Sequence, residues 1–551
     1  MDNASIAAHF ALLAKVMELH QENVFKIRSY SAVADVIATL PMPLSEMSAS
    51  QMQDIPGIGS AIASKIVQLN TDGQMDILQK YMQVTPQGVI DMLKIKGLGV
   101  KKIWTLWKDL GIESLGELEY ACKENRLIAL KGFGAKTQEN ILEQISFLQQ
   151  NSGKFLMHKA EQLWQKLHTL VITHFPEAHI QLAGELRMCA NTISHMEIVL
   201  SNIAKDTLLS CFTAQAIACE VCEDGIVGHH PILWTVYVVE AELWAKKVWE
   251  KSSSLRHFTS IQRMIQDYTD KYFDEEKDIY IAADTPYVVP ELRTENFSLE
   301  EAIALSPHLV RSQDIKGVVH THTTYSDGQN TISAMADEAM RLGYQYLAIS
   351  DHSKSAFYAQ GLKEETVFLQ HREIDEWNKK NIHQNFTLLK SIESDILIDG
   401  SLDYDADVLS TFDVVIASVH SILKMDITKA TTRLIQAVEN PYTHILGHLS
   451  GRLLLSRKGY PLDMRKIIDA CASNNVVIEL NANPHRLDID AEWIPYCMEK
   501  NVKIAINPDA HNLKGINDIH YGVKSARRGG LQREYCINTF AKDEFLQQLR
   551  K

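Results

Sequence analysis

The chain has 551 residues, which is enough for three or four domains of ordinary size. Apolar residues make up 46% and charged residues 23%, a globular composition that excludes collagen, coiled coil and disorder as the main state. The formal net charge of −14 argues, taken alone, against a dedicated nucleic-acid binder, whose charge is normally positive. No apolar run has the length of a membrane span, and no signal peptide is evident at the start. We therefore expect a cytoplasmic protein with no membrane partner.

Residues 1–150 show the pattern of helices joined by short glycine-containing turns, with helical apolar spacing over 6–19 and 32–40. One pattern occurs three times in this region. An apolar residue and a spacer precede Gly-x-Gly, and a helix is expected directly afterwards. The three segments are 55–59, 95–99 and 130–134, and the helices that follow are predicted over 61–69, 101–110 and 136–148.

These repeated segments, which we call the clips, have the properties of a phosphate-binding turn. Glycines let the backbone approach a ligand closely, and the free N–H groups of the following helix point at an anion. This is the helix-hairpin-helix pattern, which holds a DNA backbone without reading bases. Residues 94–136 carry nine Lys and Arg against five Asp and Glu, although residues 1–150 together carry −2. The DNA contacts predicted here are Gly57, Gly59, Gly97, Gly99, Lys101, Gly132, Gly134, Lys136 and Tyr30.

Two strings in the first 70 residues carry a family resemblance. ENVFKIRSY at 22–30 and IPGIGSAIASKI at 55–66 together resemble the small N-terminal domain of family X DNA polymerases. In that family a lysine after the first clip can act as a Schiff-base nucleophile at abasic sites, and Lys65 occupies this position. A lysine near other cations can have a lowered pKa and act in this way. The alternative is that Lys65 is simply a phosphate contact.

The middle of the chain, residues 151–305, mixes helices with short β-rich runs such as 232–239. GELRMCANTISHMEI at 184–198 resembles the phosphate- and metal-binding motif of the family X polymerase palm, and YVVPELR at 287–293 resembles the end of that palm. Residues 151–310 carry a net charge of −9 and are the most acidic part of the chain.

The resemblance also shows what this palm has lost. The metal-binding aspartates of the family align with His195, Glu197 and Thr235. Two-metal phosphoryl transfer needs carboxylates, because Mg²⁺ prefers hard oxygen ligands. Glu185, where the family has a serine, would place a negative charge near an incoming triphosphate. The sequence therefore predicts a degenerate palm with no polymerase activity.

From about residue 311 short apolar runs alternate with helical stretches, which indicates parallel strands. Several of the runs end in polar clusters, and in β/α folds the carboxyl ends of the strands carry the chemistry. The strands are predicted over 317–319, 346–349, 414–418, 444–446, 476–480 and 502–506.

Nine potential metal ligands occur in this region, most of them directly after an apolar run. Imidazoles interleaved with carboxylates suit Zn²⁺, Mn²⁺ or Fe²⁺ better than Mg²⁺. A His at i and i+2 at a strand end places both side chains on one side of the sheet, where they can share a metal ion. The nine are His320, His322, Asp327, His352, Glu393, His420, His448, Asp509 and His511.

These ligands and the strings between them, such as ELNANP at 479–484 and ARRG at 526–529, resemble the PHP domain fused to bacterial family X polymerases. The resemblance implies a distorted, TIM-like, usually seven-stranded β/α barrel in which nine ligands hold three divalent ions. Glu393 would bridge two of them. We expect Mn²⁺ or Zn²⁺, with Fe²⁺ as a further candidate, and no organic cofactor.

The catalytic residues expected from this resemblance and from the residue chemistry are Glu393, Asp509, Arg452 and, for a lyase activity, Lys65. The guanidinium of Arg452 can clamp a phosphate in bidentate fashion, and Lys354 and Arg486 are further candidates for that role.

The sequence thus predicts a multidomain protein with four parts. They are a small helical domain with the first clip (1–80), an all-α helix-hairpin-helix region (81–150), a degenerate α/β nucleotidyltransferase-like palm and thumb (151–305) and a PHP barrel (306–551). The leading hypothesis is a metal-dependent 3′–5′ exonuclease that acts in repair, as a monomer, on gapped, recessed or damaged duplex DNA. The alternatives are a phosphatase of a small monoester such as histidinol phosphate, a non-catalytic DNA-binding scaffold, and a still-active gap-filling polymerase.

Overall fold

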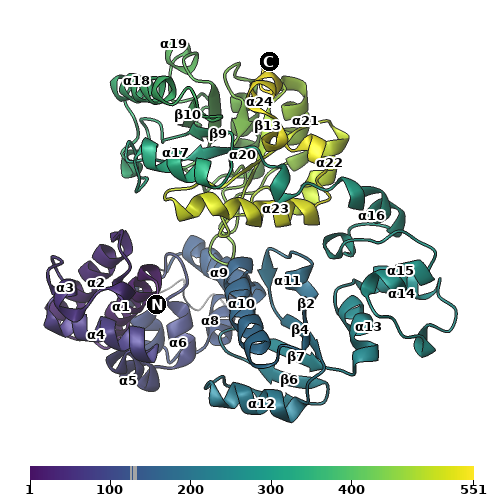
Figure 1. The fold of residues 1–551 in the computed structure, drawn as a ribbon. Helices are drawn as coiled ribbons and strands as arrows, with labels where there is room; N and C mark the ends of the chain where they lie inside the picture. The colour runs from purple at the N-terminus through teal and green to yellow at the C-terminus, as the bar shows by residue number, and fades with distance from the viewer. Residues whose placement is uncertain (124–126, 128–132, 551) are drawn as a thin grey trace. The chain divides into compact units, whose positions relative to one another are not determined.

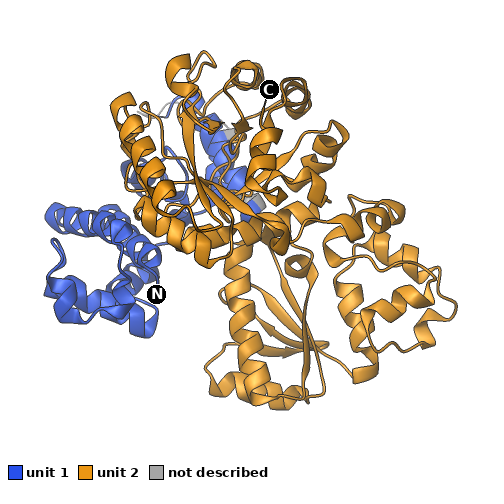
Figure 2. Ribbon diagram, turned by 45° about the horizontal axis from the view of Figure 1, so that its top comes forward, with its two compact units in different colours: residues 1–152 blue, residues 153–551 orange. Residues whose placement is uncertain are grey.

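A computed structural model describes residues 1–123, 127 and 133–550 and divides into two units, Met1–Ser152 and Gly153–Lys551 (Figure 2). The finer domain boundaries predicted at 80 and 305 stay predictions. In the part of the chain that is described, no helix combines the length and the apolar character needed to cross a membrane.

The first unit is helical throughout its described residues. Apolar faces of α1 and α2 pack together around Phe10 and Ile37, which are fully buried. A second core lies around Leu106 and Leu118. The helices are α1 (Asn3–Leu19), α2 (Val24–Thr39), α3 (Ala49–Gln53), α4 (Ser60–Asp72), α5 (Asp76–Val84), α6 (Gln87–Met92), α7 (Val100–Trp104), α8 (Leu115–Lys123) and α9 (Ala135–Asn151).

The helix predicted over 101–110 differs from the prediction in its second half. The α-helix α7 ends at Trp104, and residues Thr105–Asp109 form a π-helix. The wider turn places the neighbouring side chains of Leu106 and Trp107 in the core together, with 0% and 6% exposed. Helical periodicity in the sequence did not reveal this local change of pitch.

The second unit begins with an α/β region built on a five-stranded sheet of order β2-β4-β7-β6-β5. Its buried face surrounds Trp234 and Phe212, and the parallel pair β4–β7 lies at the centre. The strands are β1 (Phe155–Leu156), β2 (His179–Ala183), β3 (Thr192–Ile193), β4 (Met196–Ser201), β5 (Glu220–Cys222), β6 (Gly225–Gly228) and β7 (Trp234–Val238). The helices are α10 (Met157–His174), α11 (Gly184–Arg187), α12 (Lys205–Ala214), α13 (Ala241–Lys251), α14 (Leu255–Gln262), α15 (Glu276–Ala282) and α16 (Leu299–Leu305).

The remainder of this unit is a seven-stranded, all-parallel sheet that follows chain order from β8 to β14. A parallel bridge between Thr321 and Ala510 brings the first strand to the last, so the barrel is nearly closed. The strands are β8 (Gly317–Thr321), β9 (Tyr346–Ile349), β10 (Thr387–Asp395), β11 (Val414–Ser418), β12 (Ile445–Leu446), β13 (Val477–Asn481) and β14 (Ile504–Asn507). The predicted β/α barrel is confirmed.

Helices cover the outside of this barrel (Figure 1). They present buried apolar residues such as Met335, Ile374 and Leu434 to the strands. They are α17 (Ile332–Arg341), α18 (Glu364–Lys380), α19 (Ala406–Leu409), α20 (Ile427–Glu439), α21 (Met464–Asn474), α22 (Ile494–Glu499), α23 (Ile519–Arg528) and α24 (Lys542–Gln548). Because all seven strands run parallel, their carboxyl ends meet at one end of the barrel.

Candidate functional site

The nine predicted ligands all come together at the carboxyl end of the barrel. Every one of them belongs to at least one group of side chains whose ligand atoms lie within 4.8 Å of one another. The four groups overlap, so the nine residues form one continuous cluster. The groups are His322, Asp327, His352 and His511; His320, His322 and Asp509; His320, Glu393 and His448; and His352, Glu393 and His420.

Glu393 is the centre of the cluster and is 1% exposed. Its Oε1 lies 3.2 Å from His320 Nε2, 3.1 Å from His420 Nε2 and 2.9 Å from His448 Nε2. Its Oε2 lies 3.0 Å from His352 Nδ1. One carboxylate therefore faces imidazoles from several strands with both oxygens, which is the arrangement of a bridging ligand.

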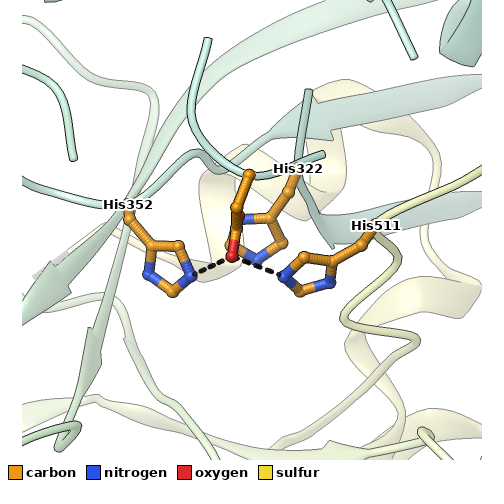
Figure 3. Close-up of side chains that lie close together, drawn as sticks. His322, His352 and His511 are labelled. Atoms are coloured by element: carbon orange, nitrogen blue, oxygen red, sulfur yellow. Dashed lines mark ion pairs between the residues drawn. The ribbon is translucent and has the colours of Figure 1, made fainter. Parts of the chain in front are cut away.

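Asp327 lies on the more open side of the cluster, where its side chain is 31% exposed. Its Oδ2 is 3.6 Å from His352 Nε2 and 3.4 Å from His511 Nε2. Figure 3 shows these two imidazoles on either side of one carboxylate oxygen, and His322 Nδ1 lies 3.8 Å from the other oxygen, Oδ1. Since the His511 side chain is also 35% exposed, solvent reaches the cluster from this side.

The backbone of β8 is irregular where it supplies two ligands. The pairing with β9 shifts register between Val318 and Thr321, and His320 has a φ of 64°. Asp509, which faces both His320 and His322 at 3.6 and 3.2 Å, has a φ of 52°. Such conformations are strained for residues other than glycine and concentrate at functional sites.

The cluster fits a metal centre on its own geometry. Buried ligand atoms of His320 (Nε2), His322 (both ring nitrogens) and Glu393 (Oε2) have no hydrogen-bond partner among the described residues. Buried polar atoms are normally bonded, so atoms left facing one another are those that a cation would join. Imidazole and carboxylate donors suit Zn²⁺, Mn²⁺ and Fe²⁺.

The charges of the cluster act on its imidazoles in opposite directions. Burial disfavours the cationic form of His352, yet Glu393 and Asp327 raise its pKa to about 10. Burial, together with the neighbouring His511 and His352, lowers the pKa of His322 to about 3. The neighbouring carboxylates thus favour a proton on His352. Bound cations would supply the positive charge in place of that proton.

Two buried carboxylates that sequence reasoning did not assign as site residues orient ligands. Glu479 Oε1 lies 2.6 Å from His320 Nδ1, and its Oε2 accepts a hydrogen bond from the backbone N–H of His448 at 2.8 Å. Asp395 Oδ1 lies 2.5 Å from His420 Nδ1. An ionised carboxylate at Nδ1 fixes the proton there and leaves Nε2 free for a metal. Asp395 is the last residue of β10, a position that could have signalled it, whereas Glu479 lies in the middle of β13.

A third buried carboxylate, Asp351, shapes the loop that carries Asp327. It accepts hydrogen bonds from the backbone N–H and hydroxyl of Thr323, from the Ser326 hydroxyl and from the Gln370 amide, at 2.5–2.7 Å. These bonds hold the loop after β8 against the end of β9. Nothing in its sequence position beside His352 distinguished this role from that of a ligand.

The basic residues expected to clamp phosphate lie in different surroundings. The guanidinium of Arg452 is bound to Asp490 and to the carbonyl oxygens of Arg486 and Leu487, so its donors are already used within the fold. Lys354 forms an ion pair with Glu364 at 2.6 Å. Arg486 Nε lies 3.5 Å from Asp509 Oδ2, directly beside the cluster. Arg486 thus contacts a candidate ligand of the cluster, whereas Arg452 is engaged by Asp490 and backbone carbonyls.

In the helical unit the first two clips, at 55–59 and 95–99, have the same backbone geometry. Gly57 and Gly97 have φ values of 92° and 85°, which suit glycine alone. The carbonyl oxygens of Gly59, Gly99 and Gly134 then accept hydrogen bonds from the N–H groups of the third and fourth residues of the helix that follows. The space around a Cβ built at any of these last three is empty within 4 Å, so this face is open. Gly132 lies outside the described residues.

The other predicted DNA contacts lie on the same unit. Lys101 and Lys136 are exposed and follow the second and third clips. Lys65 is half-buried on α4. Its Nζ donates to the Ala61 carbonyl at 3.1 Å and lies 5.9 Å from the centroid of the Tyr30 ring, which is also half-buried. A nucleophilic role for Lys65 stays a prediction.

The palm residues that align with catalytic aspartates bond to their own neighbours. Glu197 and Thr235 pair across β4 and β7, and His195 Nε2 lies 2.9 Å from the Thr235 hydroxyl. Glu197 Oε1 accepts a hydrogen bond from the Tyr237 hydroxyl at 2.9 Å and lies 3.3 Å from Lys251 Nζ. The three positions are adjacent in space, as the alignment predicted, but only one of them carries a carboxylate.

The phosphate-binding part of the palm is likewise engaged. Glu185 accepts hydrogen bonds from the backbone N–H of Ser194 at 2.6 Å and from that of His195 at 3.3 Å. Arg187 forms a two-pronged ion pair with Glu276, which also binds fully buried Arg293. The guanidinium of Arg187 and the backbone N–H groups of Ser194 and His195 are therefore already bound to side chains of this protein.

A seven-stranded parallel barrel with this cluster at its strand ends defines a PHP-type domain, and a PHP domain model matches residues 319–483. A helix-hairpin-helix domain model matches residues 1–75, and a SAM-like helix-hairpin-helix tandem model matches residues 89–146. The chain is 31% identical over 554 aligned positions to the "DNA polymerase/3′-5′ exonuclease PolX" of Bacillus subtilis (strain 168), covering 96% of this chain and 95% of the relative. The chain belongs to the bacterial PolX family, family X polymerases that carry a PHP domain. The predicted resemblance and fold class are confirmed.

Other relatives match the barrel alone. The chain is 28% identical over 245 residues to a "probable phosphatase" of Thermoanaerobacter sp. (strain X514), which covers 41% of this chain and 91% of the relative. It is 29% identical over 250 residues to a "probable phosphatase" of Acetivibrio thermocellus, covering 43% of this chain and 98% of the relative.

Proposed function

We propose that the protein is a metal-dependent 3′–5′ exonuclease that hydrolyses DNA phosphodiesters at the barrel cluster and acts in DNA repair. The observation that carries this proposal is the convergence of all nine ligands at one end of the barrel, in a chain similar to PolX over nearly its whole length. The four overlapping ligand groups support three divalent ions, Mn²⁺ or Zn²⁺, as the occupants.

The chemistry follows from the residues in place. Divalent ions held here would activate water and neutralise charge on the phosphodiester. Glu393 presents both oxygens to the centre, and Glu479 and Asp395 hold His320 and His420 in the tautomer that leaves Nε2 facing it. Arg486, beside Asp509, is positioned to bind the phosphate. The exposed side at Asp327 and His511 supplies the entrance.

The clips supply the hold on DNA in this proposal. Their open glycine faces and helix starts suit the phosphates of a backbone, and the exposed lysines beside them add positive charge. A DNA substrate is in keeping with the cytoplasmic location expected from the sequence.

We further propose that the palm does not polymerise. His195 and Thr235 hydrogen-bond to each other, and Glu197 is balanced by Lys251, so no pair of carboxylates is available to hold two Mg²⁺ ions. Arg187 is paired with Glu276 rather than free for a triphosphate. The remaining role that we propose for the palm is to support the barrel.

One assay tests both proposals. Purified protein is incubated with Mn²⁺ and a 5′-labelled duplex with a recessed 3′ end, with and without nucleotides. We expect a ladder of shortened products in both lanes. Extension of the primer would contradict the proposal that the palm does not polymerise. The variant His320→Ala with His322→Ala should lose at least about 100-fold in rate, because both are ligands. The matched control is His383→Ala, an exposed histidine elsewhere on the barrel.

The second candidate, a small-monoester phosphatase, is favoured by the probable phosphatases that match the barrel alone. Histidinol phosphate is therefore included as a substrate in the same assay. Turnover of this ester without shortening of DNA would support the phosphatase. A small ester, however, needs none of the clips, and this is why the nuclease is preferred.

A further inference from the structure

Two large aromatic side chains stand in solvent beside the metal centre. Phe357 is 86% exposed and Tyr358 is 70% exposed, and Phe357 is the most exposed large apolar residue in the described part of the chain. They lie in the short 3-10 turn Phe357–Ala359, on the loop between β9 and α18. The ligand His352 lies at the start of this loop. Exposing so much apolar area at one point of a rim is costly unless something covers it.

The loop is held firmly at both ends. The Ser355 hydroxyl donates to Asp395 Oδ2 at 3.0 Å, and Asp395 is itself the carboxylate that orients His420. The backbone N–H of Leu362 donates to the carbonyl oxygen of His352 at 2.8 Å. The two rings are therefore presented by a fixed turn, which lowers the entropy lost when they bind a ligand.

Tyr358 is also close to the ligands. Its ring centroid lies 6.1 Å from that of His352 and 6.5 Å from that of His420, and it meets both rings edge-on. A flat molecule stacked on the outer face of Tyr358 would thus lie beside the cluster. In a nucleotide the base and its own 5′-phosphate are separated by one sugar, so a base on this ring brings its phosphate to the metal centre.

We propose that Tyr358 and Phe357 form a stacking platform for the last bases of a single DNA strand, which sets the terminal phosphodiester on the metal centre. The inference rests on the proposed nuclease function and narrows its substrate to an unpaired 3′ end. The ligands are mostly buried at the barrel end, so a strand has to leave its duplex to bring a phosphate to them. Aromatic stacking accepts every base, because each base has a π-face, and this suits a nuclease without sequence preference.

The test removes the stacking interaction in two ways, by taking the terminal base from the DNA and by taking the two rings from the protein. KM and kcat are measured with Mn²⁺ for a single-stranded oligonucleotide and for the same oligonucleotide whose 3′-terminal base is replaced by hydrogen on a tetrahydrofuran abasic unit. Wild-type protein should show a KM about 5- to 100-fold higher for the abasic end. The double variant Phe357→Ala with Tyr358→Ala should show a similar rise for the normal oligonucleotide and little further rise for the abasic one. Tyr272→Ala is the matched control, since this tyrosine is 68% exposed and lies outside the barrel.

The outcomes separate this inference from the proposed function. If wild-type protein shortens neither oligonucleotide, the nuclease proposal itself is wrong. If it shortens both with the same KM, or if the double variant keeps the wild-type KM for the normal oligonucleotide, the platform is overturned and a different partner covers the rings. The arm that changes the DNA uses unmodified protein, so it does not depend on how the variant folds.

Discussion

At the scale of single residues, buried carboxylates that contact the candidate ligands organise the centre. Glu479 is fully buried, yet it contacts the ring of His320, the backbone of His448 and the amides of Asn481 and Asn507. It thus fixes two ligands on different strands at once. Such outer contacts set the orientation and basicity of the ligands and contribute strongly to metal affinity.

We therefore expect Glu479→Gln to weaken metal binding. The amide keeps the size of the side chain but supplies one acceptor oxygen where the carboxylate supplies two, so the two contacts cannot both be kept. The Mn²⁺ concentration for half-maximal exonuclease rate should rise about 10- to 100-fold, while the rate at saturating Mn²⁺ falls less. Titration of the rate with Mn²⁺ measures this. Exposed Glu499→Gln serves as the control, and an unchanged half-saturation point for Glu479→Gln would remove its assigned role.

The nine candidate ligands were predictable from the sequence because each is a metal-binding residue type, most of them follow an apolar run, and the family resemblance covers all nine. The structure brings all nine together in overlapping groups, and their role as ligands stays a prediction. Glu479 and Asp351 were not predictable as orienting residues, because a carboxylate that binds a ligand and one that binds a metal look alike in sequence. The engagement of Arg452 with Asp490 also depends on residues distant in the chain, which spacing does not reveal.

At the scale of elements, the two glycines of each clip have different roles, one in the turn itself and one where a ligand could approach. The positive φ of Gly57 and Gly97 serves the turn itself. Gly59 and Gly99 have ordinary extended φ values of −81° and −69°, which any residue can adopt, and open space around the Cβ position. Both are helix N-caps, where glycine is tolerated but not required, and in our proposal the close approach of a DNA phosphate is what favours glycine there.

The different roles of the two glycines in each clip can be tested with one variant. Gly59→Val with Gly99→Val should fold, at a cost of about 1 kcal/mol for each changed helix start. The added side chains would stand where a phosphate approaches, so the affinity for duplex DNA should fall at least about tenfold and its dependence on salt should become shallower. Fluorescence anisotropy with labelled duplex at several salt concentrations measures both.

The control for this variant is Gly116→Val, which also enters open space but lies in α8 outside the clips. If the clip variant binds DNA as tightly as wild-type protein, with the same salt dependence, the clips do not hold the DNA backbone. A loss shared by Gly116→Val would point instead to general damage to the unit.

One strand of the barrel could not be predicted from the apolar pattern of the sequence. The strand β10 (Thr387–Asp395) was not among the predicted runs, although it carries Glu393. Its polar residues Lys390, Ser391 and Ser394 interrupt the apolar pattern that identifies a buried parallel strand. The family resemblance supplied the seventh strand that periodicity did not.

At the scale of the whole molecule the net charge of −14 has an uneven distribution. Residues 1–150 carry −2 and residues 311–551 carry −3, whereas residues 151–310 carry −9. The count for the barrel includes Asp327, Glu393 and Asp509, whose charges bound cations would offset. The acidity that argued against nucleic acid is thus concentrated in the palm, which is proposed to have lost its nucleotide chemistry.

The palm nevertheless contributes to the barrel, among other contacts, through the loop that carries Arg486. Leu487 follows Arg486 in the chain and is fully buried in the hydrophobic core of the palm, while Arg486 lies beside the ligand Asp509. Next to them, the ring of His485 lies 5.2 Å from that of His158 on α10. The palm core thereby anchors the loop that presents an arginine to the metal centre.

Leu487→Ala should therefore affect both stability and catalysis. Removing a fully buried leucine costs about 2–5 kcal/mol and leaves a cavity, so the melting temperature should fall. The loosened loop should also misplace Arg486 and lower the exonuclease kcat several-fold at 25 °C, where the protein is still folded. Leu200→Ala is the matched control, because Leu200 is equally buried in the same core but is not attached to the metal centre. It should lower the melting temperature alone, and a Leu487→Ala variant that melts early but keeps its full kcat would show that the palm does not support the site.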